Sequence, residues 1–297
     1  MHNTQRFLLT FAVLACSSWL ASAQTGRLAN LSTRASCKTG EAVLINEFVI
    51  QGTGTETLVM RGIGPSLGSF GVPGALKDPT VFLFDARGRT LDANNDWMDN
   101  PDKDEIIATG IQPTDPHESA IIDTLRPGLY TFVEQGVHRT QGVALPEIYD
   151  LFDGGLQLSA VGTRAFVSTG DNVMISGFIL TGSAPVSLLI RALGPSLANA
   201  GLSRVLADPQ LELHDATGQL IFSDDNWRDT QEAEIIATGL APTDDRESAL
   251  VVTLNPGLYT NVLTGVNATT GIGFLQIYSL ELPIRELNPA PIIRGGH

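Results

Sequence analysis

The sequence predicts an all-β protein made of two tandem Greek-key or jelly-roll-like β-sandwich domains, each with one short helix. Three observations predict this fold. The chain repeats itself, short apolar runs alternate with turn residues, and a Pro-Gly-x-Tyr signature recurs near the end of each repeat. Short β-type runs separated by Gly, Pro, Asn and Asp are typical of sandwiches and barrels.

Internal repetition defines the organisation of the chain. Residues 61–67 return in similar form at 191–197, and Glu-Ile-Ile-Ala-Thr-Gly at 105–110 returns unchanged at 234–239. Roughly 50 of about 120 aligned positions are identical, far more than chance allows. The expected divisions are an export signal at residues 1–23, repeat 1 at 28–152, repeat 2 at 157–282 and an irregular tail at 283–297.

Seven strands are expected in repeat 1, mostly at intervals of about 8–12 residues, which is the spacing of sandwich folds. For the strand at 80–85, comparison of the repeats predicts which side chains face the core. Val-Phe-Leu-Phe in repeat 1 corresponds to Leu-Glu-Leu-His in repeat 2, which alternates. Val81 and Leu83 should therefore face the core, and Phe82 and Phe84 should face outward. The expected strands are 31–36, 43–51, 57–63, 80–85, 119–124, 129–135 and 143–151.

One short helix should interrupt the strands of each repeat. Asn100 followed by proline fits an N-cap, and Gly110 fits the left-handed residue that ends a helix. In repeat 2, Asp229 with Glu232 three residues later resembles a capping box.

The Leu-x-Pro-Gly-x-Tyr sequences ending at Tyr130 and Tyr259 look like tyrosine corners. In such a corner the tyrosine hydroxyl bonds to backbone upstream and fixes a crossover between sheets. This signature concerns the fold and has no catalytic meaning.

The N-terminus is predicted to be an export signal. Arg6 precedes an apolar core at 7–15, and Ala-Ser-Ala at 21–23 supplies a small-residue cleavage pattern before Gln24. The apolar run is too short to span a bilayer. In a second interpretation, the sequence ending at Cys16 resembles a lipobox and Cys16 would be lipidated. We expect an exported protein, periplasmic, cell-surface or extracellular, without a transmembrane segment.

Composition narrows the classes of partner. The chain has 18 Lys and Arg against 32 Asp and Glu, a net charge of −14, and loss of Arg6 would make it one unit more negative. Phosphate backbones and anionic lipid surfaces repel such a chain, so nucleic acid is not an expected partner. Cleavage would leave one cysteine, Cys37, and repeat 2 has Val167 there. We therefore expect Cys37 to occupy a buried apolar position and to form no intrachain disulfide.

Several shared motifs together resemble a known module. They are Gly-Pro-Ser-Leu, an Asp-Pro strand ending in Asp-Ala-x-Gly, an Asp/Asn cluster before Trp, Pro-Thr-Asp-x-x-Glu-Ser-Ala and Leu-x-Pro-Gly-Leu-Tyr-Thr. The set resembles a recurrent, largely uncharacterised module of exported bacterial proteins, about 130 residues long. More distantly it resembles the pre-peptidase C-terminal domain, a β-sandwich appended to secreted hydrolases, although no hydrolase is recognisable here. The resemblance implies an accessory or interaction role and supplies no active-site residues.

Acidic turns flank the tryptophan in each repeat. Alternating carboxylate and amide oxygens suit a hard cation such as Ca²⁺. The match to an EF-hand loop fails, because Trp97 stands at the glycine position and Lys103 at the bidentate glutamate position. Turns and helix caps use the same residue types, so a structural role is the alternative. The candidate calcium ligands are Asp92, Asn94, Asp96 and Asp99 in repeat 1 and Asp224, Asp225, Asn226 and Asp229 in repeat 2.

The repeats share no catalytic constellation. Ser119 and Ser248 each follow a glutamate, but neither lies in Gly-x-Ser-x-Gly. His117, His138 and His214 have no histidine counterpart in the other repeat. A Ser-His-Asp site would have to exist in one repeat only or span both, and no zinc pattern is present. We therefore expect no catalytic residues.

Two pairs of shared side chains have competing roles. Arg61 and Arg191 lie in apolar strands, where an ion pair or backbone clamp with one of the shared acids is expected. Trp97 and Trp227 could stack on sugars, but a tryptophan after a turn more often packs over the edge of a core, which we favour. The candidate ligand or interface residues are Trp97, Trp227, Phe82 and Phe84.

These observations favour a non-enzymatic binding or structural module of the cell envelope or extracellular space that works without a cofactor. Its partner would be an envelope or extracellular protein, or a polysaccharide. A carbohydrate-binding accessory protein is the first alternative, and a secreted hydrolase with an unrecognised site is the second.

Overall fold

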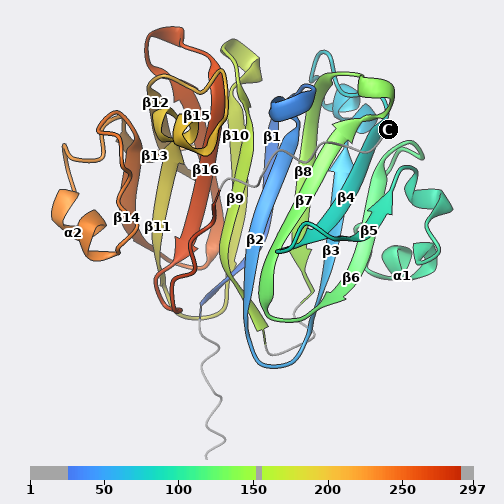
Figure 1. The fold of residues 1–297 in the computed structure, drawn as a ribbon. Coiled ribbons are helices and arrows are strands. Elements are labelled where there is room, and N and C mark those ends of the chain that lie inside the picture. The colour runs from blue at the N-terminus through green and yellow to red at the C-terminus, as the bar shows by residue number, and fades with distance from the viewer. Residues whose placement is uncertain (1–25, 152–155, 289–297) are drawn as a thin grey trace, which may run out of the picture.

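The computed structural model describes residues 26–151 and 156–288 and is almost entirely β (Figure 1). The described residues form sixteen strands, two short α-helices and several 3-10 turns, which confirms the all-β fold class. The predicted signal at 1–23, including Cys16, lies outside the described residues. Within the described ranges, no helix has the length and apolar character needed to cross a membrane.

Each repeat contributes eight strands in the same order. In repeat 1 they are β1 Arg27–Cys37, β2 Leu44–Gly52, β3 Glu56–Ile63, β4 Pro79–Asp85, β5 Thr90–Asn94, β6 Ser119–Leu125, β7 Gly128–Gly136 and β8 Gly142–Asp150. In repeat 2 they are β9 Leu156–Val167, β10 Met174–Thr181, β11 Val186–Leu193, β12 Pro209–Asp215, β13 Leu220–Asp224, β14 Ser248–Leu254, β15 Gly257–Gly265 and β16 Gly271–Ser279. The helices are α1 Lys103–Ala108 and α2 Glu232–Ala237.

The sixteen strands form one continuous hydrogen-bonded sheet, which divides into two antiparallel eight-stranded parts, sheet I and sheet II, each with four strands from each repeat. Sheet I has the order β6-β3-β8-β1-β10-β15-β12-β13. Sheet II has the order β14-β11-β16-β9-β2-β7-β4-β5. The sheets join where β1 and β9 make two parallel bridges, Leu28 with Leu158 and Ser36 with Phe166.

The repeats exchange strands at the centre of the molecule. β1 of repeat 1 pairs with β10 of repeat 2, and β9 of repeat 2 pairs with β2 of repeat 1. Since β9 and β10 are the counterparts of β1 and β2, the two contacts are related by a pseudo-two-fold axis. In Figure 1 these four strands, blue β1 and β2 and yellow-green β9 and β10, lie at the centre of the molecule where the two halves meet. Nothing in the alignment of the repeats points to this exchange.

A buried polar network lies where the exchanged strands meet. The hydroxyl of Thr33 is 2.8 Å from that of its counterpart Thr163 and 2.9 Å from that of Ser176. The hydroxyl of Thr163 donates to Asn46 Oδ1 at 2.7 Å. A slip of one residue would turn these groups to the opposite face, so the network favours one register of the four strands.

One hydrophobic core runs through both repeats. It includes Leu31 and Phe48 from repeat 1 and Phe178 from repeat 2 in a single cluster. Val81 and Leu83 are fully buried in this core, as the comparison of the repeats predicts. The shared core and the exchanged strands bind the two repeats together.

The sequence does not predict β5 or β13. Their residues are mostly polar or exposed, and each strand pairs with one neighbour only. Such short edge strands carry a weak sequence signal, because half-burial is what gives a strand its alternating pattern.

The helices begin later than predicted. The N-cap of α1 is Asp102 rather than Asn100, and that of α2 is Gln231 rather than Asp229. Asn100 Oδ1 instead accepts a hydrogen bond from the Asp102 N–H at 2.8 Å, forming a turn ahead of the helix. Gly110 follows α1 with a φ of 75°, which matches the predicted left-handed residue.

The tyrosine corners are present in both repeats. Tyr130 donates its hydroxyl to the carbonyl of Arg126 at 2.9 Å, and Tyr259 donates to that of Asn255 at 2.9 Å. Each bond reaches four residues upstream, as this corner requires.

Candidate functional site

The motifs shared by the repeats meet at a buried glutamate. Glu118 Oε1 accepts hydrogen bonds from the N–H groups of Gly64 and Ser66 at 3.1 and 3.0 Å, and from the Ser66 hydroxyl. Its counterpart Glu247 makes the same three contacts in repeat 2. A Cβ at Gly64 would lie 2.3 Å from the carbonyl oxygen of Leu76, so only glycine fits. The Gly-Pro-Ser and Asp-x-x-Glu-Ser motifs therefore form one structural unit, in which a carboxylate caps a 3-10 turn.

The shared serines are structural. Ser119 and Ser248 are fully buried, and their hydroxyls donate to the carbonyls of Pro79 and Pro209 at 2.6 Å. A hydroxyl that is closed off from solvent and bonded to backbone cannot reach a substrate.

Both tryptophans are buried, with 8% of Trp97 and 2% of Trp227 exposed. Their indole N–H groups donate to the carbonyls of Asp115 and Asp244 at 3.0 and 3.2 Å. The Arg228 guanidinium lies 4.1 Å from the centroid of the Trp227 ring. Sugar stacking needs an exposed ring face, so the burial of both rings favours the packing interpretation over the sugar-stacking alternative.

The predicted calcium ligands do not form one cluster. Asn94 Oδ1 accepts the Ala120 N–H, and its counterpart Asp224 accepts the Ala249 N–H, both at 3.0 Å. These two side chains hold the turns against the next strand, which is the structural alternative. Within residues 26–151 and 156–288, no group of three or more His, Cys, Asp or Glu is arranged to hold a metal ion. The other predicted ligands on these turns are Asp96, Asp99, Asp225, Asn226 and Asp229.

Asp92 belongs to a different acidic group. Burial and the nearby Asp92 and Asp102 raise the pKa of Asp123 to about 6, and burial with Asp102 also raises the pKa of Asp92. Repeat 2 has Phe222 and Val252 at the positions of Asp92 and Asp123. The group is therefore confined to repeat 1. Sequence reasoning missed it because its members come from three separate elements.

Phe82 and Phe84 face outward, as predicted, and stack with their ring centroids 6.3 Å apart. They pack with Val43, Ile45 and Val133 on the outer face of sheet II. All five residues belong to repeat 1. A partner site at this cluster stays a prediction.

Arg61 is held in an ion pair and a backbone clamp, but its carboxylate is not one that the repeats share. Its Nε and Nη2 atoms donate to the Glu147 carboxylate, and its Nη1 atom donates to the Ile111 carbonyl at 2.5 Å. The same carboxylate accepts hydrogen bonds from Tyr149 at 2.8 Å and Ser32 at 3.2 Å. Repeat 1 thus satisfies its arginine with its own side chains.

Arg191, the counterpart of Arg61, has a different set of partners. Its Nη1 atom donates to the Leu240 carbonyl at 2.6 Å, and its Nε atom donates to Gln276 Oε1 at 2.5 Å. Gln276 stands where repeat 1 has Glu147. The carboxylate comes instead from Glu286, 2.7 Å from Nη2. The prediction that the arginines pair with a shared acid is therefore wrong.

Glu286 lies in a segment, residues 280–288, that we name the strap. The strap follows β16 and has no helix or strand. Leu287 is 1% exposed and joins a cluster with Phe274 and Tyr278. Sequence reasoning missed this anchoring, since repeat 1 has no equivalent segment.

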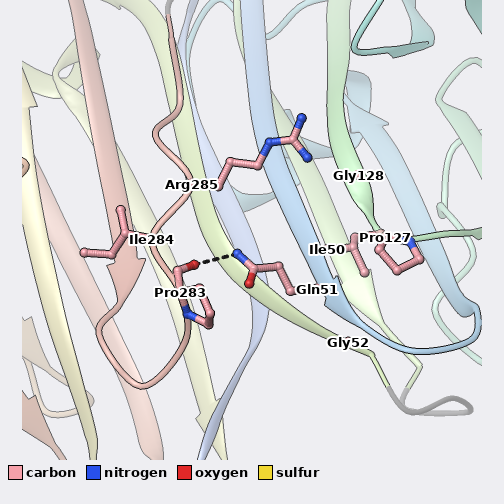
Figure 2. Close-up of a pocket in the computed structure, with 8 residues that line it drawn as sticks. All are labelled: Ile50, Gln51, Gly52, Pro127, Gly128, Pro283, Ile284 and Arg285. Carbon is pink, nitrogen blue, oxygen red and sulfur yellow. Dashed lines mark hydrogen bonds between the residues drawn. The ribbon is translucent and has the colours of Figure 1, made fainter.

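A shallow groove of about 460 Å³ lies between the strap and repeat 1. Figure 2 shows Pro283 and Ile284 on one side and Ile50 and Pro127 on the other. Gln51 Nε2 donates to the Pro283 carbonyl at 2.8 Å across the groove (Figure 2). The strap therefore contacts both repeats.

A buried carboxyl distinguishes the core of repeat 1. Glu134 is fully buried, and among the described residues neither of its carboxyl oxygens has a hydrogen-bond partner. Burial, Glu147 and Glu118 raise its pKa well above the ordinary value. Repeat 2 has Leu263 there. Beside it, burial raises the pKa of Cys37 to about 12, and this thiol occupies the predicted apolar core position.

Comparisons with known proteins add little. The chain matches no family model and no curated protein sequence. A solved structure of a DUF4785 family protein from Legionella pneumophila is similar with a TM-score of 0.24 and 11% sequence identity. The match covers 86% of this chain and 64% of that one. The likeness is too low to carry an argument about fold or function.

Proposed function

We propose that this chain is a non-enzymatic binding or structural module of the cell envelope or extracellular space. The main support is that the polar residues common to both repeats are engaged in holding the fold. Glu118 caps a turn, Ser119 and Trp97 bond to backbone carbonyls, and Tyr130 forms a corner. The residues that the repeats have in common build the fold, so a function common to both repeats is a structural or binding role and not catalysis.

The export of the chain is a second part of the proposal, and it rests on the signal-like sequence at 1–23. We also propose that the repeats are tandem copies of the exported bacterial module that their motifs resemble. Mass spectrometry of the protein from its native host tests the export. A mature chain that starts at Gln24 supports it, a lipidated Cys16 favours the anchored form, and an intact Met1 contradicts both.

A panel of chromogenic esters, peptides, glycosides and phosphoesters tests the non-enzymatic role. We expect no turnover above buffer. Ser119→Ala should lower stability by about 1–2 kcal/mol, because it leaves the Pro79 carbonyl buried without its partner. Ser248→Ala is the matched variant and should have the same effect. Turnover that disappears in a folded serine variant would show that the chain is a hydrolase.

A glycan array tests the carbohydrate alternative, which the buried tryptophans do not favour. Polysaccharide binding that survives in Trp97→Phe and Trp227→Phe would place a sugar site elsewhere on the chain.

A further inference from the structure

The strap contacts repeat 2 in the way that a bound peptide contacts its receptor. The Glu286 carboxylate meets Arg191, whose side chain is 4% exposed. The Leu287 N–H donates to the Tyr278 hydroxyl at 3.2 Å, and the Leu287 carbonyl accepts from Gln276 Nε2 at 3.0 Å. A charged anchor, an apolar anchor and two main-chain hydrogen bonds together select both the sequence and the direction of an extended segment.

The pocket for the leucine depends on a glycine. A Cβ at Gly162 would lie 2.9 Å from the Leu275 carbonyl oxygen and from Phe274 Cε2, and 3.1 Å from Leu287 Cδ1, so a side chain there would crowd both the adjacent strand and the pocket. Repeat 1 has Ser32 at this position, and the Ser32 hydroxyl donates to Glu147. Both differences allow repeat 2 to bind a peptide. Gly162 leaves room for a side chain, and Gln276 can donate a hydrogen bond to a peptide carbonyl, which a carboxylate cannot.

The remainder of the strap makes fewer contacts: the Pro283 carbonyl accepts a hydrogen bond from Gln51, and the Glu281 carboxylate accepts one from the Ser187 N–H at 3.1 Å. Pro283, Ile284, Arg285 and Glu286 are exposed, and Leu287 is the one residue between Glu281 and Asn288 that is fully buried. A segment without strand pairing is held mainly by its anchors, so another segment with the same anchors can compete for its place.

We propose that the outer face of repeat 2 around Arg191 is a binding site for an extended acidic peptide in which glutamate precedes leucine. The strap occupies this site in cis and acts as an internal competitor. The inference rests on the proposed binding role of the module and gives it a ligand class. The occupant is an extended segment of a partner protein that carries the same Glu-Leu pair and displaces the strap.

Fluorescence anisotropy with a labelled peptide of residues 281–288 tests this site. The receptor is the full chain with Glu286→Ala and Leu287→Ala, which removes both anchors of the strap. The control peptide carries the same two substitutions. The unaltered peptide should bind this variant at least about tenfold more tightly than the control peptide does, because a buried leucine and a charge contact are at stake. The unaltered peptide should also bind wild-type protein at least about tenfold more weakly than it binds the double variant, because the strap of the wild type competes for the site.

A second arm identifies the source of the competing segment. The double variant is mixed with wild-type protein and analysed by size-exclusion chromatography with light scattering. Peptide binding without mixed dimers supports a partner protein, whereas a mixed dimer shows that a second copy of the chain fills the site and overturns that assignment.

A double variant that keeps the near-UV circular dichroism of wild type and binds neither peptide overturns the inference. If the double variant unfolds, Leu287→Ala alone is titrated in the same way. Should that variant also unfold, the strap is a folding element and not a displaceable ligand, which overturns the inference too. Neither result affects the substrate panel, and turnover in that panel would overturn the proposed function without changing the peptide titration.

Discussion

Arg61 and Arg191 occupy the same position in the two repeats and are neutralised in different ways. Arg61 pairs with Glu147, a neighbour on the adjacent strand β8, whose side chain is 7% exposed. Arg191 faces Gln276 at the equivalent place and pairs with Glu286 of the strap, whose side chain is 50% exposed. Repeat 1 is therefore complete by itself, and repeat 2 needs a segment from outside its sheet.

This difference shows how a duplicated scaffold can acquire a private feature. The turn-capping glutamates, serines and tyrosine corners are the same in both repeats, since each holds backbone that both must form. The outer face around the arginine is free to differ. There Ser32 and Glu147 close repeat 1, while Gly162 and Gln276 leave repeat 2 open to the strap.

The largest expected effect comes from removing the carboxylate of repeat 1. Glu147→Ala leaves Arg61 largely buried without its charge partner and should lower the free energy of unfolding by about 3 kcal/mol. Glu286→Ala should cost about 1 kcal/mol, because water reaches the half-exposed site. Urea denaturation of both variants checks which of the two loses more unfolding free energy. Equal losses would mean that the two arginines do not differ as described.

The second effect concerns the apolar anchor of the strap. Leu287→Ala should lower the free energy of unfolding by about 2–3 kcal/mol, because it empties a buried site. Ile284→Ala is the matched control on the same strap. Ile284 is 42% exposed, and its loss should change stability by less than about 0.5 kcal/mol. Similar losses for both would show that Leu287 is not anchored.

The smallest effect concerns the buried carboxyl that repeat 2 lacks. The raised pKa of Glu134, caused by burial and by Glu147 and Glu118, means that the folded chain holds this proton to a higher pH than the unfolded chain does. Stability is therefore full below the ordinary pKa of 4.5 and falls as the pH rises through the native pKa. Glu134→Leu, which copies Leu263, should remove this loss and stabilise the protein at pH 7 by about 1 kcal/mol or more.

Thermal melts of wild type and Glu134→Leu between pH 4 and pH 8 test the sign. The two melting temperatures should diverge as the pH rises. If the two melting temperatures change in parallel with pH, the Glu134 carboxyl has a solvated partner. The adjacent Cys37 thiol stays protonated throughout this range, because burial raises its pKa to about 12.

Much of the fold was predictable because it depends on local patterns. The alternation in repeat 2 predicts the faces of Val81 and Phe82, and the Pro-Gly-x-Tyr sequence predicts the corner at Tyr130. The strand exchange was not predictable, because β1 has the same residues whether its neighbour is β2 or β10. Pairing between strands that are distant in the sequence depends on how the whole chain folds, and a local residue pattern contains little information about it.

The site was less predictable than the fold. Shared residues such as Trp97 and Ser119 attract functional interpretations, yet burial and backbone hydrogen bonds define their roles. Conversely, the strap has no counterpart in repeat 1, so comparison of the repeats could not reveal it. One signal was available in the sequence: Gln276 replaces Glu147 opposite an arginine that both repeats have, which implies a carboxylate from elsewhere.

A double-mutant cycle between Arg191→Lys and Glu286→Gln tests most directly whether the strap serves the arginine of repeat 2. The matched cycle between Arg61→Lys and Glu147→Gln provides the reference in repeat 1. Unfolding free energies should give a coupling of about 1 kcal/mol for the strap pair and a larger one for the reference pair. A strap coupling indistinguishable from zero, beside a clear coupling in repeat 1, would contradict the account.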